Sequence, residues 1–158
     1  MDAPAWLGLQ PTHNPMRWVL PVTPGISTGH QFLFGGCGLG AAIAALEGTS
    51  GRPVVWATAQ YIPYAAPSAV VAIVVTVAVD GHQITQARAV CHVADREILT
   101  VNAALGERDI EASGQWEQMP ADVPSPEECE QRRHFSEMSV SINDRLEERM
   151  VKARPFER

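Results

Sequence analysis

The segment from Gly36 to Glu47, which reads GCGLGAAIAALE, constrains this chain more than any other part of the sequence. Its pattern predicts a helix of about three turns, ended by Gly48 because glycine is favoured just after a helix. Glu47 is the one charged residue of the segment, so the helix has no polar face. A helix that is apolar all round is buried on every side, and its small residues let other backbone segments approach closely. The chain must therefore supply a surface that surrounds this helix.

Segments rich in valine, isoleucine and threonine supply that surface. The expected strands are Arg17 to Val22, Arg52 to Ile62, Ser68 to Asp80, His82 to Ala94 and Arg96 to Leu105. Asp80-Gly81 is a strong hairpin signal and Ala94-Asp95-Arg96 is a second tight reversal, so the last three strands form an antiparallel meander. The order of one strand, one helix and four strands predicts an α+β fold in which an antiparallel sheet wraps around a central apolar helix.

The character of the sequence changes near Ser113, where we expect a domain boundary. Residues 1–113 form the predicted domain, and residues 114–158 form a proline- and acid-rich linker with a charged C-terminal tail. Most of the excess acidic charge lies in residues 107–158, which hold thirteen acidic and eight basic residues, whereas residues 1–106 hold five and four; the net charge of the chain is −6. The stretch from Ile142 to Arg158 is expected to be helical in part, and the tail as a whole is expected to be solvated or to dock on a partner.

Composition excludes several classes of protein. No basic patch of the kind that phosphate backbones require is present, so no nucleic-acid binding is expected. The longest apolar run, Ala69 to Val79, is about half of what a membrane-spanning helix needs, and the N-terminus lacks the pattern of a signal peptide. The three scattered cysteines fit a reducing cytosol better than a disulfide framework. We therefore expect a cytoplasmic protein without a membrane span.

Two other interpretations of the glycine-rich stretch are weaker. The spacing Gly36-x-Gly38-x-x-Ala41 matches the loose dinucleotide fingerprint, but that fold needs a parallel sheet and an acidic residue about 20 residues further on. Residues 53–79 contain no charged residue, and the later strands are joined by hairpins. A dinucleotide site is therefore not favoured.

The second interpretation makes Cys37 a nucleophile, activated by the helix N-terminus and by His30, His82 or His92 as base. The alternative is an inert, packed thiol, and nothing in the sequence fixes a Cys–His pair in space. No metal site is expected, because adjacent residues such as Cys91 and His92 point to opposite faces of a strand.

The order of elements, together with several motifs, resembles the hot-dog fold and, more narrowly, one N-terminal repeat of the acyl-CoA thioesterase II family. Members of that family carry two hot-dog repeats in one chain. The similarity covers most of residues 17–130. The matching segments are Phe34 to Leu46, Trp56 to Pro67, Val77 to Gly106 and Met119 to Cys129.

The resemblance implies hydrolysis of acyl-CoA thioesters by an activated water, without a covalent intermediate. It places the helix start at Gly35 and Gly36, with Cys37 next to it, beside the thioester carbonyl. It also places Thr58 where the family's second repeat has a water-orienting Ser or Thr. The alternative for Thr58 is an ordinary strand threonine.

Two catalytic side chains of the family have no counterpart at the aligned positions. Where the family has an Asp in the helix, this chain has small residues near Gly40 and Ala41, and the catalytic Gln falls near Ala103 or Ala104.

Local substitutes for these two side chains exist. His30 is a candidate base near neutral pH, and a water could be held by Asn102, Gln60, Gln83 or Gln86. The alternative for each of these residues, which the sequence favours, is a satisfied polar group without a catalytic role.

The sequence therefore predicts a thioesterase-like protein that hydrolyses or binds acyl-CoA, with catalytic candidates Thr58, His30 and Asn102. The expected substrate-binding residues are Gly35, Gly36, Cys37 and Gln60. No cofactor is expected. A single repeat with such an apolar helix should pair with a second copy or with another hot-dog chain. The alternative function is a non-catalytic subunit that binds acyl groups or completes an active site with its partner. A hydratase of this fold would need an Asp/His or Glu/His pair near the helix, and none is evident.

Overall fold

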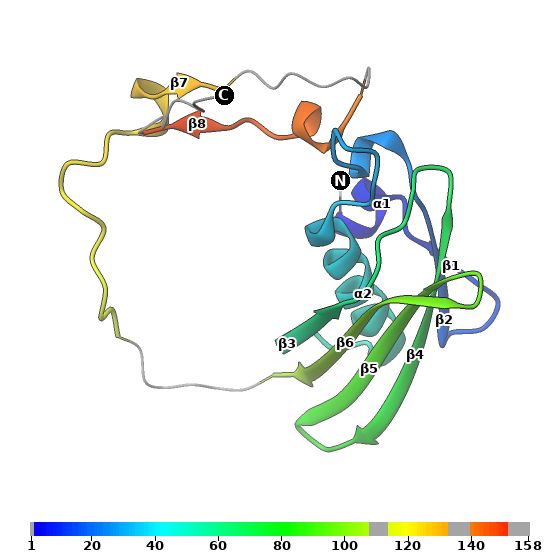
Figure 1. Ribbon diagram of the computed structural model, residues 1–158. Helices are drawn as coiled ribbons and strands as arrows, with labels where there is room; N and C mark the ends of the chain where they lie inside the picture. Colours follow the sequence, from blue (N-terminus) through cyan, green and yellow to red (C-terminus); the bar gives the residue numbers. More distant parts are fainter. Residues whose placement is uncertain (1, 108–113, 133–139, 152–158) are drawn as a thin grey trace.

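The computed structural model describes residues 2–107, 114–132 and 140–151 (Figure 1). Its elements, in chain order, are α1 (Ala3–Leu7), β1 (Gln10–Pro11), β2 (Arg17–Pro21), the 3₁₀ turn η1 (Pro24–Ile26), α2 (Gly35–Ser50), β3 (Val54–Tyr61), β4 (Val70–Asp80), β5 (Ile84–Val93), β6 (Arg96–Gly106), η2 (Pro126–Glu128), β7 (Glu130–Gln131), η3 (Ile142–Arg145) and β8 (Arg149–Met150).

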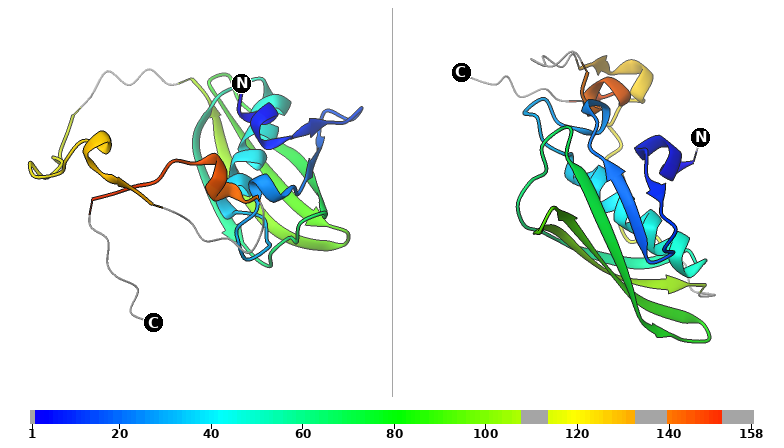
Figure 2. Two further views of the ribbon diagram at one scale, coloured as in Figure 1. Left: turned by 90° about the horizontal axis from the view of Figure 1, so that it is seen from above. Right: turned by 90° about the vertical axis from the view of Figure 1, so that its right-hand side faces the viewer.

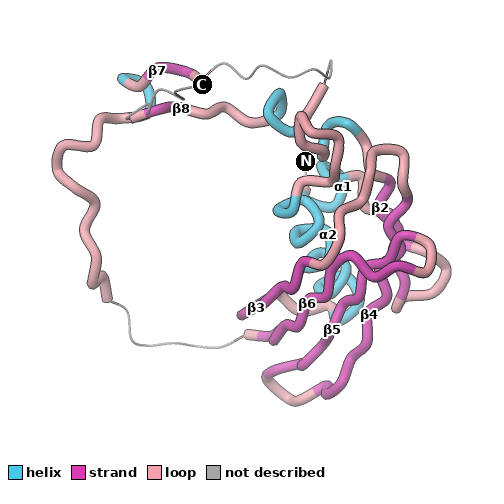
Figure 3. The backbone as a smooth tube through the Cα atoms, viewed as in Figure 1, coloured by secondary structure: helices cyan, strands magenta, loops and turns pink. Residues whose placement is uncertain are grey.

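Six of the strands form one antiparallel sheet in the order β1-β2-β4-β5-β6-β3. The strand that follows the helix, β3, therefore lies at one edge beside β6 rather than next to β4. Helix α2 lies against one face of the sheet, and the long strands β4, β5 and β6 curve along it (Figures 2 and 3). The predicted α+β fold, with an antiparallel sheet around a central helix and a meander of the last three long strands, is confirmed.

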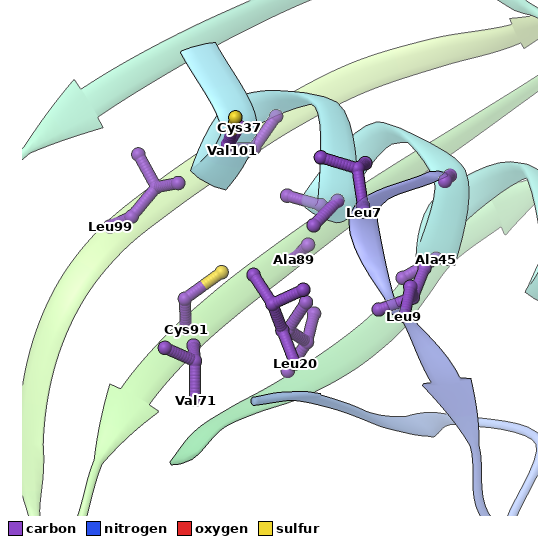
Figure 4. Close-up of a cluster of buried hydrophobic side chains, with 14 of the residues drawn as sticks. Leu7, Leu9, Leu20, Cys37, Ala45, Val71, Ala89, Cys91, Leu99 and Val101 are labelled. Atoms are coloured by element: carbon purple, nitrogen blue, oxygen red, sulfur yellow. The ribbon is translucent and has the colours of Figure 1, made fainter. Parts of the chain in front are cut away.

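The contact between α2 and the sheet is made largely by small side chains. Ala41, Ala42 and Ala45 of α2 are fully buried, and β5 presents Ala87 and Ala89 to the same core. Figure 4 shows the core side chains that gather between the helix and the strands. Because interiors are packed as densely as organic crystals, small residues on both surfaces bring the helix backbone close to the sheet.

The predicted end of the helix at Gly48 is wrong. The helix continues to Ser50 and is ended by Gly51, which adopts the left-handed conformation with φ 70°. Gly48 is required by packing instead, because a Cβ atom there would lie 2.6 Å from the ring of Trp18. That ring is held in place by a hydrogen bond of 3.0 Å from its Nε1 to Oγ1 of Thr49.

The C-terminal segment returns to the sheet domain after residues 114–132. The backbone N–H of Ile142 donates to the carbonyl of Ser27 at 2.8 Å, and Ile142 is buried. The guanidinium of Arg145 lies 3.8 Å from the ring centre of Trp6 and donates to the carbonyl of Trp6 at 2.9 Å. This segment thus contacts both η1 and α1.

Two predictions about the C-terminal part bear on this segment. The expected boundary near Ser113 lies outside the described residues. Of the partly helical stretch expected from residue 142 onward, the described part contains one 3₁₀ turn, η3, and the strand β8, which pairs with β7.

Among the described residues, no helix has the length and apolarity needed to cross a membrane.

Gly40 and Gly48 of α2 have opposite environments, and this difference gives a stability prediction. A Cβ at Gly40 would lie 3.6 Å from Leu7, an ordinary contact, so Gly40→Ala should raise the free energy of unfolding by about 1 kcal/mol through helix propensity. Gly48→Ala should lower it by about 1 kcal/mol, because overpacking costs roughly 1–3 kcal/mol against a similar propensity gain. Urea denaturation of both variants measures the difference, and shifts of the same sign would contradict this account of the helix.

Candidate functional site

A largely apolar cavity of about 280 Å³ lies between the start of α2 and the sheet. It is lined by Leu20, Phe32, Leu33, Gly35, Gly38, Tyr61, Ile62, Pro63, Tyr64, Ala65, Val71, Ile73, Cys91, Ile98 and Leu99. None of these lining residues carries a carboxylate, an imidazole or a basic group. The polar side-chain groups at the wall are two tyrosine hydroxyls and one thiol, so the cavity suits an apolar group.

The cavity has a mouth and a deep end. Tyr61 and Tyr64 are 54% and 68% exposed and mark the mouth. At the deep end, Leu20, Ile73 and Cys91 are at most 1% exposed. An elongated apolar group would therefore enter beside the tyrosines and end against β4 and β5.

Two loops form the mouth and are tied to each other. The N–H of Leu33, in the loop before α2, donates to the carbonyl of Ala65 at 2.8 Å. The rings of Phe32 and Tyr64 lie 6.0 Å apart. The Tyr61 hydroxyl donates to the carbonyl of Gly35 at 3.0 Å, which joins the end of β3 to the first residue of α2. The mouth is thus a connected structure next to the helix N-terminus.

Glycine at two positions of α2 leaves the cavity open. A Cβ at Gly35 would lie 3.2 Å from the Tyr61 ring, which is closer than most real contacts. A Cβ at Gly38 would meet Leu33 at 3.4 Å and Leu99 at 3.5 Å and would occupy cavity space.

The start of α2 provides the polar character of the site. The N–H groups of Cys37 and Gly38 donate to the carbonyl of Phe34 at 3.0 and 3.1 Å, while the first N–H groups of a helix have no partner within it. The first turn of α2 has no acidic residue that would offset the positive end of the helix dipole. A carbonyl oxygen that gains negative charge would be stabilised beside Gly35.

Burial keeps the cysteine thiols of this region neutral. The pKa of Cys91 is raised to about 12, mainly by burial and to a smaller extent by the nearby Glu97. Burial also raises the pKa of Cys37, and Arg145 offsets part of that rise. Because the thiolate is the nucleophilic form, a raised pKa favours the interpretation of Cys37 as an inert, packed thiol.

A second cavity, of about 510 Å³, lies on another side of the α2 N-terminus, against α1 and the returning C-terminal segment. It is lined by Asp2, Ala3, Trp6, Leu7, Phe34, Gly36, Cys37, Gly40, Ile142 and Leu146. The first turn of the helix therefore separates two cavities, with Gly35 and Gly38 on one and Gly36 and Cys37 on the other.

The predicted substrate-binding residues are divided by this arrangement. Gly35 lines the apolar cavity, whereas Gly36 and Cys37 line the second one. Gln60 is exposed on β3 between Ala59, which packs on the core, and Tyr61, which lines the cavity. Because successive side chains of a strand alternate between faces, Gln60 points to the face opposite α2.

The predicted catalytic residues are not gathered at one point. Thr58 and Asn102 are paired in register across β3 and β6 and are both exposed. Their neighbours in sequence pack on the core, so both side chains point to the face opposite α2. His30 lies by the mouth of the apolar cavity, where its ring stacks on Phe32 at 6.4 Å. The catalytic roles of these three residues stay predictions.

Sequence reasoning missed Tyr61 and Tyr64 as residues of the site. A signal for Tyr61 was present, because it shares the strand face of Ala57 and Ala59, which alternation directs toward the helix. Tyr64 lies in the loop between β3 and β4, and no local pattern placed that loop over the helix start.

Two rejected interpretations can be compared with the structure. The six-stranded sheet is antiparallel throughout, whereas a dinucleotide-binding fold requires a parallel sheet. Within residues 2–107, 114–132 and 140–151, no cluster of three or more His, Cys, Asp or Glu side chains could hold a metal ion.

Comparison with solved structures identifies the fold. A candidate thioesterase from Novosphingobium aromaticivorans matches with a TM-score of 0.71 and 29% identity, over 80% of this chain and 50% of that one. A candidate thioesterase II from Thermobifida fusca matches with a TM-score of 0.74 and 16% identity, over 92% of this chain and 53% of that one. A hypothetical thioesterase from Streptococcus pneumoniae, crystallised with coenzyme A, matches with a TM-score of 0.55 and 10% identity, over 59% of this chain and 80% of that one. No family model and no curated protein matches the sequence.

The chain therefore has the hot-dog fold, and it is similar to thioesterases of that fold. Its similarity extends to proteins of the thioesterase II type, as the sequence resemblance predicts. The chain spans about half the length of the Novosphingobium and Thermobifida structures.

Proposed function

We propose that this chain binds acyl-CoA thioesters, with the acyl group in the apolar cavity and the thioester at its mouth beside Gly35. The observation that carries the proposal is the position of the cavity, whose wall includes both Tyr61 and Gly35, the first residue of α2, which are joined by a hydrogen bond. An apolar chain in the cavity removes its surface from water, and the positive end of the helix faces the thioester carbonyl. The coenzyme A bound by the Streptococcus neighbour gives further support.

In a hydrolase of this kind, water adds to the thioester carbon, negative charge develops on the carbonyl oxygen, and the coenzyme A thiolate leaves. The N–H groups at the start of α2 would stabilise that charge. The attacking water needs a base, and His30 is the predicted residue closest in place, by the mouth at Phe32. Thr58, Asn102 and Gln60 would act only on a water or substrate that reaches the edge strand β3 from the opposite face.

The alternative is a non-catalytic subunit that binds the acyl group, while a partner chain supplies the acid and amide groups. One observation favours it: the residues that line the cavity include no carboxylate and no imidazole. Both alternatives use the same cavity, so they differ in turnover and not in binding.

An assay of coenzyme A thiol release separates the two functions. The purified chain is given a panel of acyl-CoA esters, and thiol release is followed with a chromogenic disulfide. If the chain is a complete enzyme, His30→Ala should lower kcat/KM by about 100-fold, the scale of one acid–base or positioning group. Thr58→Ala or Asn102→Ala should lower it by a similar factor only if the reacting water lies on the face of β3 opposite α2. Thr76→Ala, an exposed threonine on β4, is the matched control and should leave the rate unchanged.

Measurable acyl-CoA binding without turnover would support the non-catalytic subunit. Absence of both binding and turnover for every ester would contradict the proposed function. Turnover that none of the three variants lowers would overturn the assigned catalytic residues while leaving the binding site in place.

We further propose that the chain pairs through the edge strand β3 with a second copy or another hot-dog chain. In the described part of the sheet, β3 is the last strand, and it carries the exposed residues Val55, Trp56 and Tyr61. A long exposed edge strand with apolar side chains is normally covered, and pairing there would place a second chain next to the mouth of the cavity.

We also propose a cytoplasmic location for the chain. Its three cysteines are free and buried, which is typical of proteins in a reducing compartment.

Native mass measurement tests this pairing. Trp56 is 56% exposed on β3, whereas Trp116 is 89% exposed in the segment after the sheet. Trp56→Lys should convert an oligomer into a monomer, because it places a charge in the proposed interface. Trp116→Lys, the same change elsewhere, should leave the mass unchanged. A monomeric parent chain with full acyl-CoA binding would rule out the pairing.

A further inference from the structure

The apolar cavity is closed at its deep end, and this sets a limit on the length of its ligand. Ile73 of β4 and Cys91 of β5 are paired in register and lie side by side there. Val71, two residues along β4 from Ile73, and Leu20 of β2 complete the closed end, which we call the cavity floor. All four residues are at most 1% exposed. The strands behind them are joined by continuous backbone pairing, so a chain cannot pass through the floor.

The interface between α2 and the sheet leaves no space for a ligand beyond the cavity. Beyond the cavity, Ala41 and Ala45 of α2, Ala89 of β5 and Val101 of β6 are all 0% exposed. These side chains fill the interface between α2 and the sheet, and Figure 4 shows Ala45, Ala89 and Val101 among them. A ligand that enters at the mouth must therefore end at the floor.

The volume of the cavity gives the size of the group that fits. An engineered cavity of about 150 Å³ lined by apolar side chains binds one benzene molecule, with six carbon atoms. On that scale the present cavity of about 280 Å³ holds roughly eleven carbon atoms. We propose that the cavity selects acyl groups of about eight to ten carbons, straight or phenyl-bearing, and excludes long-chain fatty acyl groups. The proposal rests on the proposed acyl-CoA binding and adds a substrate class to it.

The chemistry of the floor restricts the end of the acyl group. The floor is made of aliphatic side chains and the Cys91 thiol, which is at most a weak hydrogen-bond donor. A terminal carboxylate or hydroxyl would be buried there without an adequate partner, which is unfavourable. The favoured ligand therefore ends in a methyl or a phenyl group.

Two variants change the cavity from different sides. Cys91→Met extends a flexible, apolar side chain from the floor into the cavity. Gly38→Ala adds a methyl group from the helix, in ordinary contact with Leu33 and Leu99 at 3.4 and 3.5 Å, and should fold even if the floor variant does not. Gly40→Ala is the matched control, because it adds the same methyl group on the same helix outside this cavity.

Calorimetric binding of acetyl-, octanoyl-, octanedioyl-, decanoyl- and palmitoyl-CoA to the full chain tests the proposal, with thioether analogues if turnover occurs. Octanoyl- or decanoyl-CoA should bind more than about tenfold tighter than acetyl-CoA, because each buried methylene is worth about fourfold in affinity. They should exceed palmitoyl-CoA by a similar factor, because the cavity floor stops the longer chain before its thioester reaches Gly35. Cys91→Met and Gly38→Ala should weaken the binding of decanoyl-CoA by about fourfold or more and leave the affinity for acetyl-CoA unchanged. Gly40→Ala should keep the parent profile.

Two results would overturn the proposal while leaving the proposed function intact. One is palmitoyl-CoA binding as tightly as decanoyl-CoA, and the other is folded Cys91→Met and Gly38→Ala variants that both keep the parent chain-length profile. Octanedioyl-CoA binding as tightly as octanoyl-CoA would overturn the assignment of an apolar floor. No binding of any acyl-CoA would instead contradict the proposed function itself.

Discussion

The close contact of a helix made of small residues with a sheet face made of small residues is the constraint on which this structure depends. Ala41, Ala42 and Ala45 are buried without residual exposure, and β5 presents Ala87 and Ala89 to the same core. Larger side chains on either surface would force the two backbones apart, because densely packed interiors tolerate little added volume. The sheet can curve along the helix only because so little volume separates them.

The cavity arises where this contact is interrupted. The middle of α2 presents alanines, and there the interface is filled. At its first turn the helix presents Gly35 and Gly38, and there space remains between the helix and the sheet. The space lies next to the N-terminal end of the helix dipole, so an apolar pocket and a site that stabilises negative charge adjoin each other. The glycine-rich opening of the helix thus has two roles, one in leaving volume and one in exposing backbone N–H groups.

Much of the fold could be predicted from the sequence, because it depends on local patterns. The apolar helix, the four strands after it and the two hairpins each have a signal within a few residues. The helix end could not be placed, since Gly48 and Gly51 are equally good candidates until Trp18, 30 residues before Gly48, is known to pack on the first of them. The position of β3 at the sheet edge is also non-local, because it depends on pairing with β6.

The candidate site was predicted less completely. Gly35 and His30 lie at or near the mouth. The sequence also suggested Thr58, from the resemblance, and Asn102, as a local substitute, and alternation with core residues places both on the other face of the sheet. The second cavity required knowledge of the C-terminal segment, because Ile142 and Leu146 form part of its wall. A contact between Arg145 and Trp6 has no sequence signal.

The central claim is that the acyl group of a thioester lies between α2 and the sheet, with the thioester carbonyl beside the helix start. A crystal structure of the chain with a decanoyl-CoA thioether analogue tests it most directly. The account predicts acyl carbons in contact with Gly38 and Cys91 and the thioether group next to Gly35. An acyl chain in the second cavity, against Trp6 and Cys37, or outside both cavities, would contradict it.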